Sequence, residues 1–214
     1  MKTKITLAIL FSFLTTTVNC NHYHEAILNN NINKLYAITK QKVNGINQKA
    51  KYGNTPLHLA VELNVKLNNE TIIQFLIDNW ADRFLINDNG QTPLHIAAKA
   101  CPLSVMKIII LSWPSYFGND ARYNKLVIYL NTKDFNGNTF LHLICQRTDI
   151  PHDFIQKLIE EFGANKSIQN KFGQKPQDIA KNTFDQMAIK SQSILVSSPK
   201  VKNIYKIIEH LLSN

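Results

Sequence analysis

The sequence lacks most features from which enzymes build active sites. Only seven glycines occur in 214 residues, and none lies in a glycine-rich loop that could cradle a phosphate. Neither an HExxH helix nor a GxSxG turn is present. The only adjacent acidic pair, Glu160-Glu161, would point in different directions on a helix. We therefore expect no enzymatic activity, no catalytic residue and no cofactor, and keep a cryptic enzyme as the third alternative.

Cysteine is scarce, with one residue each at Cys20, Cys101 and Cys145. These spacings give neither a disulfide framework nor a CxxC zinc motif, so we expect no metal site. Cys145 falls in an apolar, helix-like segment, which favours a buried free thiol. His22 and His24 stand beside Cys20 and could bind a metal with it, but near a chain end we expect them to be solvated.

Acidic residues are few, 15 against 24 lysines and arginines, so the formal charge is +9. This excess favours an acidic partner or an anionic surface. Nucleic acid is disfavoured, because no motif that reads bases accompanies the charge. The abundance of Lys, Asn and Ile indicates an AT-rich genome more than a physical requirement.

Long apolar runs are missing except at the beginning of the chain. Lys2 and Lys4 precede a mainly apolar run over 5–14, and small polar residues follow over 15–20. This layout is typical of a secretory signal peptide and is too short to span a bilayer, with an ordinary buried helix as the alternative. Residues 1–20 hold two lysines and no acid, so their removal leaves a charge of +7. We expect an exported protein without a transmembrane segment, in the periplasm, on the cell surface or in a host cell.

The end of this segment, Thr17-Val18-Asn19-Cys20, resembles the lipobox of bacterial lipoproteins. Thr17 and Asn19 stand where that motif has leucine and a small residue. A lipid anchor on Cys20 and plain cleavage near Cys20 are both open alternatives.

What the chain does contain is one eight-residue motif written four times. The copies are GNTPLHLA, GQTPLHIA, GNTFLHLI and GQKPQDIA, which begin at Gly53, Gly90, Gly137 and Gly173. Their starts lie 37, 47 and 36 residues apart, which indicates stacked supersecondary units. Thr55-Pro56 and Thr92-Pro93 are helix starts, because the hydroxyl accepts from free amides and proline fits the first helical position.

A second apolar helix is expected after each motif, over 71–78, 104–111, 153–163 and 202–212. Ile, Leu and Phe recur there at steps of three and four residues. Helices this short are not stable alone, but stacked pairs can bury one continuous core.

This repeat resembles the ankyrin repeat. Residues 81–97, ADRFLINDNGQTPLHIA, follow the family pattern almost position for position, and 163–174 look like its hairpin segment. The resemblance implies an all-α ankyrin-repeat solenoid of helix-turn-helix units joined by β-hairpin or loop fingers. The expected repeat domain covers 21–213, in units 22–46, 47–80, 81–128, 129–163 and 164–213.

The terminal units look like caps. Residues 24–49 resemble a degenerate first repeat, and in the last unit Lys175, Gln177 and Asp178 replace Thr, Leu and His, as a polar outer face requires. Against the family period of about 33 residues, the excess falls within 64–70, 114–127 and 147–152, where we expect loops. Residues 184–200 look like a further inserted loop.

The resemblance also gives the motif histidines a structural role. In the family this histidine hydrogen-bonds near the threonine that caps its own helix and reaches a neighbouring unit. Metal ligands must converge on one point, whereas stacked repeats spread equivalent residues along a row. The structural motif then comprises Thr55, Pro56, His58, Thr92, Pro93, His95, Thr139 and His142.

Ankyrin repeats bind proteins through finger tips and the concave face of the first helices, so the resemblance implies partner-binding residues on both. The tips supply Lys51, Tyr52, Asn54, Asp88, Asn89, Gln91, Phe135, Asn136, Asn138, Lys171, Phe172 and Gln174. The first helices supply Glu62, Leu63, Lys99, Ala100, Gln146 and Arg147. The tip aromatics either anchor a partner or fold back onto their own or the next finger.

The insert around 113–129 is rich in aromatic residues, including Trp113, Tyr116 and Phe117. It either packs on its own repeats or forms a partner-binding finger. We expect a monomeric, exported protein–protein interaction module. It would be a host-directed effector of an intracellular bacterium or, alternatively, an envelope protein that acts as an endogenous inhibitor or scaffold.

Overall fold

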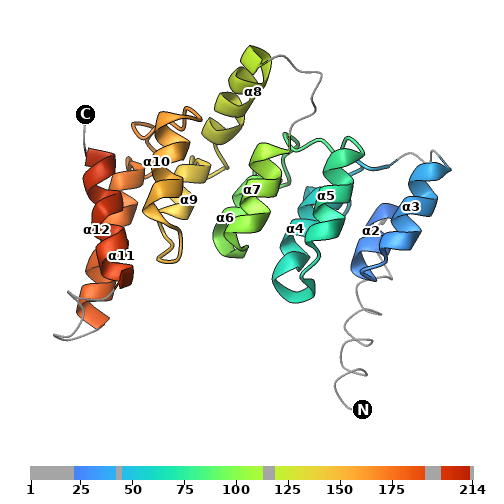
Figure 1. Ribbon diagram of the computed structural model, residues 1–214, viewed down its shortest axis with the longest axis horizontal. Coiled ribbons are helices and arrows are strands. Elements are labelled where there is room, and N and C mark those ends of the chain that lie inside the picture. Colours follow the sequence, from blue (N-terminus) through green and yellow to red (C-terminus); the bar gives the residue numbers. More distant parts are fainter. Residues whose placement is uncertain (1–21, 42–44, 113–118, 191–198, 213–214) are drawn as a thin grey trace, which may run out of the picture.

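A computed structural model describes residues 22–41, 45–112, 119–190 and 199–212, so the expected signal peptide over 1–20 lies outside the described residues. The helices are α2 (His22–Leu28), α3 (Ile32–Lys40), α4 (Pro56–Leu67), α5 (Glu70–Asp78), α6 (Pro93–Ala100), α7 (Leu103–Leu111), α8 (Asn119–Asn131), α9 (Phe140–Ile144), α10 (His152–Glu160), α11 (Pro176–Lys190) and α12 (Pro199–Leu212). All but α8 stand side by side in pairs, from α2 and α3 to α11 and α12, and α8 contacts α9 (Figure 1). This confirms the expected all-α solenoid.

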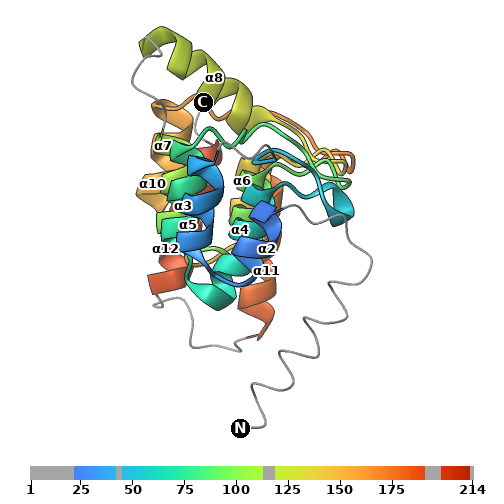
Figure 2. The ribbon, with the colours of Figure 1, turned by 90° about the vertical axis from the view of Figure 1, so that its right-hand side faces the viewer.

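The pairs form two layers. The inner layer runs α2, α4, α6, α9 and α11, and the outer layer runs α3, α5, α7, α10 and α12 (Figure 2). Leu57, Leu76, Leu94 and Ile109 are among the fully buried side chains between them. No helix within the described ranges is both long and apolar enough to cross a bilayer.

Four fingers connect the units and extend from the inner layer, away from the outer one (Figure 2). We number them as the first finger (50–54), the second (87–91), the third (134–138) and the fourth (170–174). In each, the first amide donates to the last carbonyl at 2.8–2.9 Å, and the glycine amide donates back to the first carbonyl. In the later three fingers an Asn or Asp side chain at the first position accepts further amides. The fingers are therefore tight turns, and no β-strand occurs in the part of the chain that the structure describes.

Three inner helices begin with the expected threonine cap. Pro56 and Pro93 are the first residues of α4 and α6. Thr55, Thr92 and Thr139 precede their helices, and each exchanges hydrogen bonds with the histidine three residues later. In the last unit, Asp178 occupies the histidine position, and its carboxylate accepts a hydrogen bond from the Lys175 amide at 2.8 Å.

The histidines join neighbouring units as well as capping their own. Because the Thr55 amide donates to His58 Nδ1 at 3.3 Å, that nitrogen is an acceptor and the proton of the neutral ring lies on Nε2. His58 Nε2 then donates to the Gln91 carbonyl of the next unit at 2.8 Å. His95 and His142 repeat the arrangement towards the Asn138 and Gln174 carbonyls. These are the hydrogen bonds that the resemblance implied for the motif histidines.

One histidine was placed wrongly. His24 is only 1 % exposed and contacts the Asn54 carbonyl through Nε2 at 3.0 Å, so it is the first member of the same row rather than a solvated residue. It precedes His58 by 34 residues, close to the repeat period, and this spacing was the signal available in the sequence. His22 is exposed, as expected.

Two expected loops are partly helical. Residues 119–131 form α8, which contains the boundary expected between the third and fourth units. Its Leu126, Tyr129 and Leu130 are buried at helical spacing, and the Tyr129 ring lies 5.1 Å from the Phe84 ring. Likewise, α11 continues to Lys190 and α12 begins at Pro199, so 184–190 and 199–200 of the second expected loop are helical, and 191–198 lie outside the described residues.

Candidate functional site

A groove lies where the first two fingers meet α4 and α6 on the inner layer. It has a volume of about 300 Å³. Its lining residues are Tyr52, Asn54, Val61, Glu62, Val65, Asn87, Asn89, Gln91, Ile96, Lys99, Ala100 and Cys101. The fold thus gathers finger residues and helix residues that the resemblance had assigned separately to partner binding.

The groove combines an apolar floor with opposite charges. Val65 is 58 % exposed and Ile96 is partly buried, so hydrocarbon remains accessible. Glu62 and Lys99 are both exposed and add one charge of each sign, and Asn54 Nδ2 donates to Glu62 Oε2 at 3.3 Å. The groove is at the lower limit of the volumes of small-molecule pockets. It has room for one or two side chains of a partner protein.

The three tip aromatics are on the surface. Tyr52 is 63 % exposed, Phe135 is 56 % exposed and Phe172 is 73 % exposed. Phe135 also lies over Gly90 of the preceding finger, and Lys51 Nζ stands 4.7 Å from the centre of the Tyr52 ring. The aromatics therefore keep most of their surface available to a partner even where they pack on a finger.

Several expected contact residues are not accessible. Gln91 and Asn138 are buried, and a histidine of the preceding unit donates to the carbonyl of each. Arg147 is structural, since its Nη1 donates to the Cys101 carbonyl at 2.7 Å and so caps the end of α6. Gln91, Asn138 and Arg147 therefore correct the expected binding surface, whereas Leu63 is half-buried and its predicted role stays a prediction.

The other predicted residues differ in how exposed they are. Asp88, Asn89, Asn136, Lys171 and Gln146 are exposed. Asn54 and Gln174 are half-buried. Trp113, Tyr116 and Phe117 lie outside the described residues, so the role predicted for them stays a prediction.

The sequence analysis did not predict two surface features. The first is the contribution of Val65 and Ile96 to the groove. It could have been predicted, because these residues lie about one helical turn from Glu62 and Lys99. A second hollow of about 680 Å³ lies on the outer layer, between α3, α5 and α7, with Tyr36, Glu70 and Asp78 in its lining. It contains none of the predicted residues.

The described cysteines are buried thiols. Cys101 and Cys145 are unpaired, and burial raises their pKa values to about 11 and about 12. Across the described ranges, no three His, Cys, Asp or Glu side chains are placed to hold a metal ion.

We expect Cys101 and Cys145 to resist alkylation at pH 8 in the folded protein, because their reactive thiolate forms are scarce and covered. Mass spectrometry of a Cys20→Ser variant treated with iodoacetamide would measure this. Both thiols should label within minutes in denaturant, whereas rapid labelling of the folded protein would contradict the burial.

Residues 23–115 match the family model described as ankyrin repeats (3 copies). The chain is 32% identical over 122 residues to human transient receptor potential cation channel subfamily A member 1, covering 57% of this chain and 9% of that protein. It is 41% identical over 52 residues to the putative ankyrin repeat protein FPV230 of fowlpox virus, covering 24% and 26%. It is 31% identical over 93 residues to oxysterol-binding protein homolog 2 of Saccharomyces cerevisiae, covering 42% and 7%. The chain thus spans at most about a quarter of these relatives.

Proposed function

This chain carries ankyrin repeats, which imply a protein–protein interaction module of a generally non-enzymatic family, and from that premise we propose that it binds a protein partner through the groove between α4 and α6 and through its finger tips. The observation that carries the proposal is the joining of Tyr52, Glu62 and Lys99 around one accessible apolar floor. Burial of one apolar anchor inside a polar rim is the usual arrangement of a binding hot spot. The partner would insert an apolar side chain beside Val65.

The charge supports an acidic partner. Lys51 and Lys171 are exposed on the first and fourth fingers, next to the two most exposed tip aromatics. A negatively charged partner surface would be attracted to such tips, and its association rate would fall as salt is added.

The first test is affinity capture from host-cell lysate with matched variants as bait. Val65→Asp places a negative charge on the groove floor. Ile128→Asp is the matched control, because it places the same charge on α8, outside the groove. The two side chains are similarly exposed, Val65 to 58 % and Ile128 to 63 %. We expect Val65→Asp to weaken a captured protein's binding by about tenfold or more, and Ile128→Asp to leave it unchanged.

A second variant separates the tips from the groove. Tyr52→Ala/Phe135→Ala/Phe172→Ala removes the three exposed rings, and its melting temperature shows whether the fold survives. Loss of capture at an unchanged melting temperature supports a tip-mediated contact. Equal capture by wild type and by both the groove and tip variants would contradict the proposed surface.

Export is the second part of the proposal. It is supported by the basic start, the short apolar run and the small polar end of residues 1–20. Together with the AT-rich composition, these features favour an effector of an intracellular bacterium. An endogenous envelope inhibitor or scaffold is the alternative, and a captured partner from the host or from the bacterial envelope would distinguish them.

Fusion of residues 1–20 to alkaline phosphatase tests export, because the reporter is active only outside the cytoplasm. A Cys20→Ser variant tests lipidation.

A further inference from the structure

The fingers are joined by a backbone hydrogen-bond ladder that is complete between neighbours and open at its C-terminal end. At each junction, an amide of one finger donates to the carbonyl just before the preceding finger's glycine. The pairs are Asp88 to Tyr52 at 3.0 Å, Phe135 to Asn89 at 3.1 Å and Lys171 to Asn136 at 2.9 Å. Phe172 holds the acceptor position in the fourth finger, and no described residue donates to its carbonyl.

The space beside each finger glycine also shows that the fourth finger is uncovered on one side. A Cβ added at Gly53 would stand 2.8 Å from the Asp88 amide nitrogen, and one at Gly137 would stand 2.8 Å from the Lys171 amide nitrogen. At Gly173 nothing among the described atoms lies within 4 Å, although its φ of +72° matches the others. The fourth finger therefore has the conformation of a covered finger and lacks a described cover.

The first finger has a similar sequence to the fourth and shows which kind of turn can cover it. The first finger contains Lys-Tyr-Gly at 51–53, and the fourth contains Lys-Phe-Gly at 171–173. An Asn-Asp-Asn-Gly turn over 87–90 covers the first, with its aspartate over Gly53. Tyr52 has a φ of +61°, but Asn89 and Asn136 accept the same bond without a positive φ, so the bond does not depend on that conformation.

A side-chain contact completes this internal example. Asn87 Nδ2 donates to Asn54 Oδ1 at 3.0 Å, and Asn170 Nδ2 donates to Asn138 Oδ1 at 3.0 Å. Gln174 occupies the corresponding position in the fourth finger and carries the same kind of amide oxygen. An incoming turn that begins with asparagine would find this acceptor.

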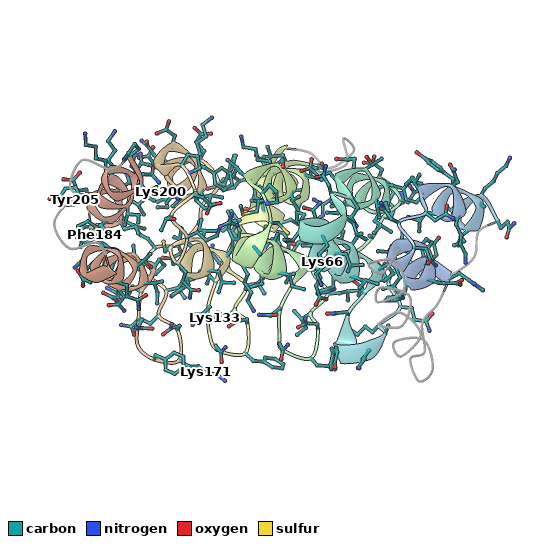
Figure 3. The ribbon with its side chains drawn as sticks, turned by 90° about the horizontal axis from the view of Figure 1, so that it is seen from below. Lys66, Lys133, Lys171, Phe184, Lys200 and Tyr205 are labelled. Carbon is teal, nitrogen blue, oxygen red and sulfur yellow. The ribbon has the colours of Figure 1, made fainter. Side chains whose placement is uncertain are left out.

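Charge favours an acidic occupant. The last unit, 164–212, holds eight lysines against Asp178, Asp185 and Glu209. Figure 3 shows Lys171 at the far end of its finger, directed away from the helices, with Lys133 just before the third finger. The positive charge of this unit would therefore attract an acidic turn to the open side of the fourth finger.

We propose that the open edge of the fourth finger docks an acidic tight turn of a partner protein, of the type Asn-Asp-Asn-Gly. The second residue of that turn donates its backbone N–H to the Phe172 carbonyl, and its carboxylate lies over Gly173, as Asp88 lies over Gly53. The inference rests on the proposed function, because Phe172 is one of the proposed contact aromatics, and it adds the chemistry that this finger recognises.

The probe is a cyclised peptide with the sequence of residues 85–92, LINDNGQT, titrated into the ¹⁵N-labelled full chain. We expect concentration-dependent shifts of the Phe172, Gly173 and Gln174 amide signals, with the first finger unaffected because it is already covered. Gly173→Ala should weaken binding by about tenfold, since its Cβ enters the space of the incoming turn while meeting no described atom of the chain.

The matched control is the same peptide with Asp88→Pro, which removes the donating N–H and should abolish the shifts. Equal shifts with both peptides, equal binding by Gly173→Ala, or no shift at these amides up to the solubility limit would overturn the proposal. Val65→Asp should bind the peptide normally, so a failure here and a failure of the groove are distinguishable.

Discussion

Lowering the pH from 7 to 5 is expected to reduce the free energy of unfolding by on the order of 2 kcal/mol through His58 alone. Burial is the main cause that lowers the pKa of His58 from 6.5 to about 4 in the folded protein. The unfolded state then binds more protons between those two values, so stability is lost as the pH falls below about 6.5.

The hydrogen bonds explain why protonation is resisted. His58 Nδ1 accepts from the Thr55 amide, and a proton on that nitrogen would place two donors face to face in a buried site. Burial also lowers the pKa of His24, His95 and His142, so the whole row should add to the loss. The acid sensitivity therefore belongs to the junctions between units.

Urea unfolding at pH 7 and pH 5 measures the effect, with His58→Asn as the comparison. The variant should be less stable at pH 7 yet lose less on acidification, because one of the titrating groups is gone. An identical loss in both proteins would show that His58 does not titrate as described.

Gly137→Ala is expected to destabilise the protein by about 3 kcal/mol or more, and Gly173→Ala by only about 1 kcal/mol. Both glycines have a left-handed φ, +78° and +72°, so both substitutions carry the same backbone strain. At Gly137 the new Cβ would also meet the backbone of Asn170 and Lys171 at 2.8–3.2 Å. Relief of that contact would require the Lys171–Asn136 hydrogen bond to lengthen.

The pair is compared by thermal and urea unfolding under one set of conditions. Gly90→Ala should fall between them, because its Cβ would meet the half-exposed Phe135 ring, which can rotate away. Equal losses at Gly137 and Gly173 would mean that the contact between fingers contributes nothing beyond backbone strain.

The sequence was most informative at positions where a residue type has a well-defined local role, such as capping a helix. Thr-Pro before an apolar run predicted the starts of α4 and α6, and the recurrence of His58, His95 and His142 predicted their structural role. It failed where the local pattern was degenerate. His24 lacks the preceding threonine, and the helical spacing of Leu126, Tyr129 and Leu130 runs from a segment read as an insert into the next unit.

By itself, the sequence determined the repeat, the paired helices and the tight turns, because capping, proline placement and apolar periodicity act within a few residues of the chain. Only the tertiary structure decided accessibility. Gln91 and Asn138 occupy tip positions but are covered, Arg147 is used to cap α6, and Val65 is left open beside Glu62 and Lys99. Accessibility depends on which side chains of the adjacent unit cover a residue, and those lie 30 or more residues away along the chain.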